Sequence, residues 1–232
     1  MSKHIGIVGC SSEGAALCYK TICVEASKKL GEYEHPEVSM HTHSFGKYMK
    51  AKNNNDWQQA AEIMLSSTDK LVKCGADFVI CPDNTIHQAF PYLKDRTSIP
   101  WIHIAEVVTK VAKSLHYKKV AVLGTEFLMT GPVYSEYFQK LDIEYVIPSQ
   151  QERERIHETI FTELIKGVFL EKSRLYFNEI IQKQKEQGCD AVVLGCTEIP
   201  LLVDPNDCPL PSLDSTRLLA QAAIKEACGE QV

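Results

Sequence analysis

The chain alternates short apolar runs with longer segments in which apolar residues recur every three or four positions. The short runs have the length and β-branched content of buried parallel strands, and the longer segments have the periodicity of amphipathic helices. Strands are predicted over residues 5–9, 38–43, 75–82, 99–104, 119–124, 143–147, 191–194 and 210–214, and helices over 15–30, 57–72, 105–115, 150–169, 172–187 and 216–228. This alternation predicts an α/β protein built on parallel sheets.

The second part of the chain repeats the first. Residues 75–84 match 188–197 in spacing, and two further strand landmarks recur at offsets of about 111 to 115 residues, which chance rarely supplies. We therefore expect two similar β/α halves, each a parallel sheet flanked by helices, related by a pseudo-two-fold duplication. The first half is predicted to comprise residues 1–104 plus 214–232 and the second 105–213, with an active site in the cleft between them.

Polar groups end two of the predicted strands at equivalent positions, Asp83 in the first half and Cys196 in the second. A carbon acid held between two proton-transfer groups can lose a proton to one and regain it from the other, which inverts the carbon. A thiol suits this work because its pKa is easily lowered towards neutral pH. Neighbouring hydroxyl and amide side chains are expected to hold a substrate carboxylate and to stabilise an enediolate. They are Asn84, Thr85, Thr125, Thr197, Ser11 and Ser12.

Composition excludes several other classes of protein. A net charge of −5 over 232 residues gives no reason to expect nucleic acid or an acidic membrane surface as a partner. No apolar run approaches a membrane span, and the start offers no signal peptide, so a cytoplasmic location is expected. The nine cysteines contain no Cys-x-x-Cys pair and are expected to be free thiols that bind no metal.

Nearly the whole chain resembles the aspartate/glutamate racemase family of cofactor-independent amino-acid racemases. The resemblance is carried by Asn-Thr-Ile-His at 84–87, Leu-Gly-Thr at 123–125, Glu-Leu-Ile-Lys-Gly at 163–167 and Leu-Gly-Cys-Thr-Glu-Ile-Pro-Leu-Leu at 194–202. It implies that two opposed cysteines exchange protons without metal or pyridoxal phosphate, and that Cys196 is the second of them. It also implies substrate contacts from Asn84, Thr85, Thr125, Thr197 and the helix residue Lys166.

The first half departs from the family pattern. Asp83 stands where the family has its first catalytic cysteine, and Gly-Cys-Ser-Ser-Glu at 9–13 replaces the usual Gly-Gly-Met-Gly-Pro. Cys81 lies two residues upstream, about 6.5 Å along an extended strand, and is too far away to substitute. Asp83 can be a proton donor opposite Cys196, a group that binds the substrate amine, or a cap of the next helix.

The sequence predicts an isomerase of the aspartate/glutamate type that uses no cofactor and inverts the α-carbon of an amino acid. Two alternatives stay open: a single-cysteine decarboxylase or isomerase of the same superfamily, and a catalytically degenerate protein that binds an amino acid. The expected partner is a small amino-acid substrate. The amino acid, the preferred enantiomer and the oligomeric state, with a homodimer as one alternative, are left undecided.

Overall fold

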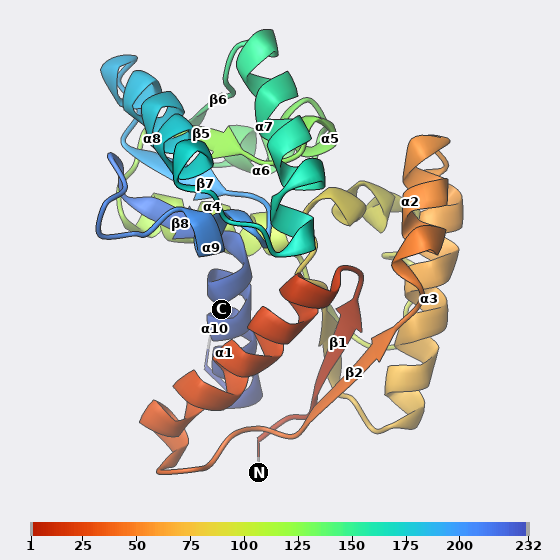
Figure 1. Ribbon diagram of the computed structural model, residues 1–232. Coiled ribbons are helices and arrows are strands. Elements are labelled where there is room, and N and C mark those ends of the chain that lie inside the picture. Colours follow the sequence, from red (N-terminus) through yellow and green to blue (C-terminus); the bar gives the residue numbers. More distant parts are fainter. Residues whose placement is uncertain (1, 231–232) are drawn as a thin grey trace. The chain divides into compact units, whose positions relative to one another are not determined.

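The computed structural model describes residues 2–230 of the 232-residue chain. It divides into two compact units, one formed by Met1–Val107 with Thr216–Val232 and the other by Val108–Ser215. Each unit contains one four-stranded parallel sheet with helices packed against it (Figure 1). The predicted α/β fold is therefore confirmed.

The sheet of the first unit has the strand order β2-β1-β3-β4. Its strands are β1 (Ile5–Gly9), β2 (Val38–Thr42), β3 (Phe78–Ile80) and β4 (Trp101–Ile102). The helices are α1 (Ser12–Leu30), α2 (Phe45–Asn53), α3 (Trp57–Lys73), the 3₁₀ helix η1 (Thr85–Tyr92), the first residues of α4 (Ile104–Ser114) and nearly all of α10 (Ser215–Ala227).

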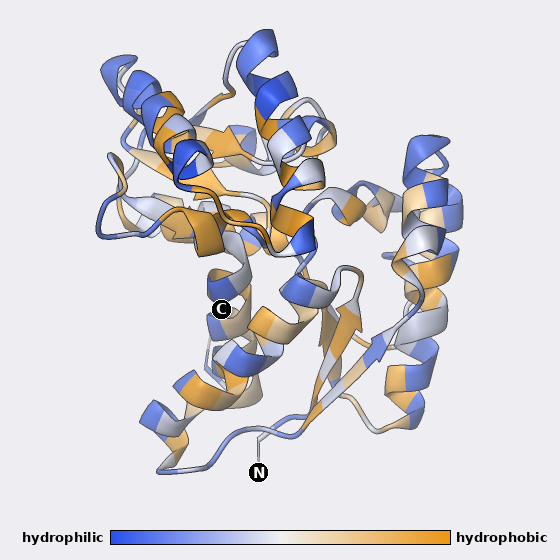
Figure 2. Cartoon of the chain, in the orientation of Figure 1, coloured by the Kyte–Doolittle hydropathy of each residue, from blue (hydrophilic) through white to orange (hydrophobic). Residues whose placement is uncertain are grey.

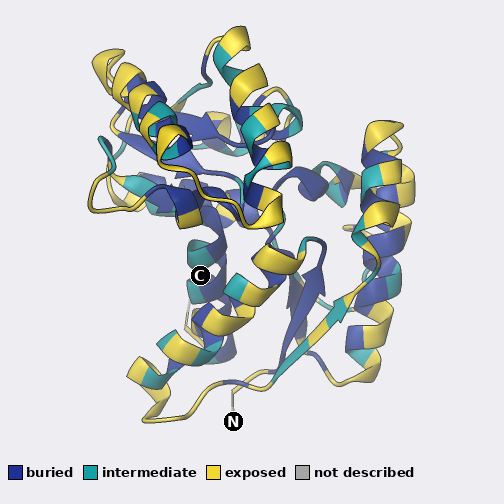
Figure 3. Cartoon of the chain, viewed as in Figure 1, coloured by how far each residue is buried: buried dark blue, intermediate teal, exposed yellow. Residues whose placement is uncertain are grey.

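Alternate residues of β1 and β3 face opposite layers of helix, because successive side chains of a strand point to opposite faces. Ile5, Ile7, Phe78 and Ile80 pack with apolar residues of α1 and α10. Val8, Cys10, Val79 and Cys81 pack on the other face with α2, α3 and η1. The central strands β1 and β3 are apolar and buried, whereas the edge strand β2 and the outer surfaces of the helices are more polar and exposed (Figures 2 and 3).

The sheet of the second unit has the order β6-β5-β7-β8. Its strands are β5 (Lys119–Leu123), β6 (Glu144–Val146), β7 (Ala191–Leu194) and β8 (Ser212–Asp214). The helices are the rest of α4, α5 (Glu126–Met129), α6 (Ser135–Lys140), α7 (Gln150–Thr162), η2 (Leu164–Lys166), α8 (Glu171–Glu186) and α9 (Ile199–Leu202). Apolar residues of α7 and α8 cover the face of the sheet formed by Ala121, Leu123, Val192 and Leu194.

The two sheets have the same topology and the same register. Ile5 pairs with Phe78 in the first unit, and Val120 pairs with Ala191 in the second, which gives offsets of 115 and 113 residues for the equivalent strands. In each unit, the aspartate that precedes the third strand accepts a hydrogen bond from the backbone near the start of the first strand. Asp77 Oδ2 accepts from the backbone N–H of His4 at 2.6 Å, and Asp190 Oδ2 accepts from that of the equivalent Lys119 at 2.9 Å.

One predicted helix is wrong in its extent. The helix expected over 150–169 ends at Thr162. The chain then forms a single 3₁₀ turn at Leu164–Lys166, which Gly167 ends in a left-handed conformation with φ 71°. Sequence periodicity also missed α2 and the short helices α5 and α6, which supply too few turns for an apolar pattern to repeat. Within residues 2–230, no helix is both long and apolar enough to cross a membrane.

Candidate active site

In the second unit, the ends of strands β5 and β7 lie close together at two glycines. Leu123 of β5 pairs with Leu194 of β7, so Gly124 and Gly195 follow side by side, and Gly195 N–H donates to the Leu123 carbonyl at 2.7 Å. A Cβ on Gly195 would lie 3.0 Å from that carbonyl oxygen and 2.5 Å from Leu128 Cδ2. Glycine at this position permits the close approach without displacing the β5 backbone.

Cys196 is hydrogen-bonded to a buried carboxylate. Its Sγ donates to Glu198 Oε2 at 2.9 Å, and the Thr197 hydroxyl donates to the same oxygen at 2.7 Å. Glu198 is 3 % exposed, while Cys196 is partly exposed. A carboxylate that accepts a hydrogen bond from a thiol can also take up the thiol proton, which leaves a thiolate.

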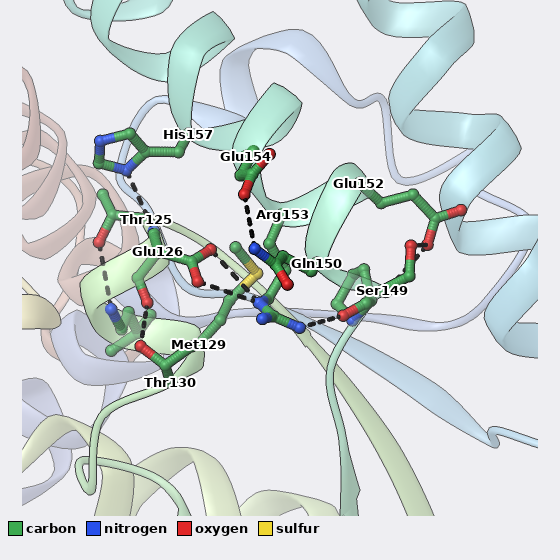
Figure 4. A network of polar contacts seen from close by, with 12 residues as sticks. Thr125, Glu126, Met129, Thr130, Ser149, Gln150, Glu152, Arg153, Glu154 and His157 are labelled. Atoms are coloured by element: carbon green, nitrogen blue, oxygen red, sulfur yellow. Dashed lines mark hydrogen bonds and ion pairs between the residues drawn. The ribbon is translucent and has the colours of Figure 1, made fainter.

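Thr125 is fixed by the turn that begins α5. Its hydroxyl oxygen accepts from the Leu128 N–H at 3.3 Å and so caps this short helix. The carboxylate of the next residue, Glu126, accepts a hydrogen bond from Arg153 Nε at 3.2 Å (Figure 4). The backbone N–H of Glu126 donates to His157 Nδ1 at 3.1 Å. These contacts from α7 hold the turn that positions Thr125.

The first unit presents Asp83 at the end of β3. The Asp83 side chain is partly exposed, and Oδ1 accepts from the Ile86 N–H at 3.3 Å, as expected of a residue that caps the following helix. The carbonyl of Asp83 contacts His87 Nδ1 at 2.8 Å. Asn84 and Thr85, which follow, are buried in the first turn of η1.

The side chain of Asp83 lies among buried titratable groups that face the α2 side of the sheet. Burial, and then the Asp83 charge, raise the pKa of the Cys10 thiol well above its ordinary value, and the thiol donates a hydrogen bond to Asp83. The pKa of Cys81 is raised by burial and by Asp83 in the same way. Lys52 of α2 is 7 % exposed and is the cation that acts on Cys10.

Two buried histidines, His87 and His103, lie near Asp83. Burial lowers the pKa of His87 to about 4, so its ring is neutral, and the Asp83 carbonyl at Nδ1 makes that nitrogen the protonated one. The His87 and His103 rings meet edge to face with centroids 4.5 Å apart. His87 Nε2 is buried without a hydrogen-bond partner within the described residues.

Three predicted binding residues are more exposed to solvent than the other predicted binding residues, which are buried. Ser11 caps α1 by accepting from the Gly14 N–H at 3.3 Å, and Ser12 is exposed at the first position of that helix. Lys166 is exposed in η2 and not on a long helix as expected.

His41 and His43 contact the hydroxyls of Ser67 and Ser66 at 3.0 and 3.1 Å, and all nine cysteines are free. Over residues 2–230, no group of three or more histidine, cysteine or acidic side chains is arranged to hold a metal ion.

Sequence reasoning left out three residues that the structure brings to the strand ends: Glu198, Cys10 and Lys52. Glu198 stood in the signature segment but was equally explicable as a helix-start carboxylate. The signal for Cys10 was the duplication, because the β1 offset of 115 residues equates it with Thr125. Lys52 lies in α2, the helix that periodicity missed.

Comparison with known proteins identifies the family. The family described as Asp/Glu/Hydantoin racemase matches residues 7–223. The broad specificity amino-acid racemase RacX of Bacillus subtilis (strain 168) is 24 % identical over 169 residues, 73 % of either chain.

Two solved structures are similar over almost the whole chain. A candidate Asp/Glu racemase from Yersinia pestis has a TM-score of 0.89 at 28 % identity, covering 97 % of this chain and 99 % of its own. An aspartate racemase homologue from Pyrococcus horikoshii OT3 has a TM-score of 0.85 at 27 % identity, covering 98 % and 100 %. The predicted enzyme class, an isomerase of the amino-acid racemase type, is confirmed. The chain belongs to the Asp/Glu/Hydantoin racemase family.

Proposed function

We propose that this racemase interconverts the enantiomers of aspartate or glutamate by proton transfer through Cys196 and Asp83, without a cofactor. The observation that carries the proposal is the 2.9 Å hydrogen bond from Cys196 Sγ to the buried Glu198 carboxylate at the end of β7. The names of the two similar structures, a candidate Asp/Glu racemase and an aspartate racemase homologue, support an acidic substrate.

The proton transfers balance in three steps. Glu198 takes the thiol proton of Cys196 and leaves a thiolate. The thiolate takes the α-proton of the substrate, and the electron pair of the broken C–H bond delocalises into the α-carboxylate as an enediolate. Protonated Asp83 then gives its proton to the opposite face of the α-carbon, which inverts it. These steps leave Glu198 protonated and Asp83 ionised, and proton exchange with solvent restores both groups. The reverse reaction uses the same groups in the opposite order.

Hydrogen-bond donors stabilise the enediolate when they already point to where its charge develops. We assign the substrate carboxylates to the polar groups at the strand ends. Asn84 and Thr85 begin η1, while Thr125 and Thr197 flank the Cys196 turn; all four are buried at 8 % exposure or less. Ser11 and the exposed Ser12 and Lys166 complete the proposed set.

The decisive test is proton exchange in deuterium oxide. Each enantiomer of the twenty amino acids is incubated with the protein, and α-deuteration and optical inversion are followed by NMR and chiral chromatography. The proposal predicts deuteration with inversion of aspartate or glutamate. Gas release from a substituted malonate without exchange would indicate the single-cysteine decarboxylase chemistry, and thermal stabilisation by an amino acid without exchange would indicate a protein that only binds.

A further inference from the structure

Cys10 and Asp83 occupy facing positions just beyond two paired strands. Ile7 of β1 pairs with Ile80 of β3. Cys10 lies three residues after Ile7, and Asp83 lies three residues after Ile80. Cys10 is 5 % exposed and packs on the same face of the sheet as Cys81. This geometry brings its thiol to the Asp83 carboxylate, to which it donates a hydrogen bond.

The second unit contains a thiol–carboxylate pair of its own, in which Cys196 donates to Glu198. There the thiol stands at the end of the third strand and the buried carboxylate supports it. In the first unit the carboxylate, Asp83, stands at the end of the third strand, and the buried thiol, Cys10, supports it. Each unit therefore pairs a thiol with a carboxylate, but the supporting groups come from different places: Cys10 follows the first strand of its unit, whereas Glu198 follows Cys196 by two residues.

We propose that Cys10 is the positioning residue of Asp83: its thiol orients the carboxyl group and sets the pH at which that group takes up a proton. The proposal rests on the proposed function in assigning proton transfer to Asp83. It also explains two departures of this chain from its family together, since the cysteine in the first loop and the aspartate at the strand end form one pair.

The thiol can act in this way because it stays protonated. Burial and the Asp83 charge both disfavour a Cys10 thiolate and raise its pKa, so the S–H remains available as a donor at neutral pH. Donation to a carboxylate favours its charged form and so lowers the pH at which it binds a proton. The other titratable groups around the pair are Lys52 and Tyr48 of α2, Cys81 after β3 and His87 of η1.

The test compares Cys10→Ala, which deletes the donor, with Cys10→Ser, which keeps one. The carboxyl group of Asp83 is titrated by ¹³C NMR in protein labelled at aspartate, with Asp83→Asn assigning the signal. Cys10→Ala should move the titration midpoint upwards by about 0.5 to 1 pH unit, and Cys10→Ser should restore most of the shift. Cys189→Ala is the matched control, because Cys189 is also 5 % exposed and lies in the core of the other unit.

The same variants are then compared in racemisation. In the direction in which protonated Asp83 donates, the alkaline limb of the kcat–pH profile should move with the NMR midpoint in Cys10→Ala, while KM stays within about twofold. An Asp83 midpoint that is identical in wild type and Cys10→Ala would overturn the proposal. If wild-type protein exchanges no α-proton, the proposed function fails, and the NMR titration still decides whether Cys10 controls Asp83.

Discussion

Glu198→Gln separates the chemical role of this carboxylate from its structural role. Glutamine has the same length and its amide oxygen can still accept a hydrogen bond, but it carries no charge and takes up no proton at neutral pH. If Glu198 accepts the Cys196 proton, turnover should fall by about 10²–10⁴-fold, the usual contribution of a positioned acid or base.

The stability change should be small by comparison. Glu198 Oε2 accepts two bonds, at 2.7 and 2.9 Å, and each changes from charge-assisted to neutral, a loss of about 1 kcal/mol apiece. Burying an amide also costs less than burying a carboxylate, which offsets part of the loss. The net effect should be below about 2 kcal/mol, which corresponds to a Tm decrease of roughly 4 to 8 °C at most in a chain of this size.

The assay is the α-deuteration rate of each substrate enantiomer, with Tm measured on the same samples. Glu152→Gln is a suitable control, since Glu152 accepts from the Ser149 hydroxyl at 2.7 Å at the start of α7 and should affect only stability. The double variant Cys196→Ser with Glu198→Gln should be no slower than Cys196→Ser alone, because residues that act as a unit are not additive. Retention of more than about a tenth of the wild-type rate by Glu198→Gln would refute the role given to this residue.

Three further predictions concern stability and inversion. Burial lowers the pKa of His87 to about 4, against 6.5 ordinarily, so the unfolded chain binds more protons between these values; the free energy of unfolding should fall by up to about 3 kcal/mol as pH drops through that window. Urea titrations should show this loss reduced in His87→Gln but retained in His116→Asn, which changes an exposed histidine. Gly195→Ala places a Cβ 3.0 Å from a β5 carbonyl oxygen and should lower the unfolding free energy by about 1–3 kcal/mol, whereas Gly46→Ala, at an open helix position, should not destabilise. Asp83→Asn should abolish optical inversion while one enantiomer still exchanges its α-hydrogen with solvent; racemisation at the wild-type rate would instead make Asp83 a capping residue.

The repeated spacing of segments 75–84 and 188–197 was enough to predict two equivalent sheets, because strand register depends on local apolar pattern. Short helices such as α2 and α5 could not be predicted, since tertiary contacts rather than periodicity stabilise so few turns. Asp83 and Cys196 were identified from the ends of apolar runs. The partners of these residues were harder to see, because Cys10 meets Asp83 only through a pairing between strands 73 residues apart.

The route of the chain between its two units has a consequence for synthesis on the ribosome. The core of the first unit needs Leu219, Ala220 and Ala223 of α10, which are translated more than a hundred residues after the rest of that core. At roughly 5–20 residues per second, the N-terminal sheet waits several seconds with α1 in place on the face that α10 will complete. The second unit, continuous from Val108 to Ser215, emerges complete in the meantime. The order of folding should therefore run against the order of synthesis, with the first-made unit finished last.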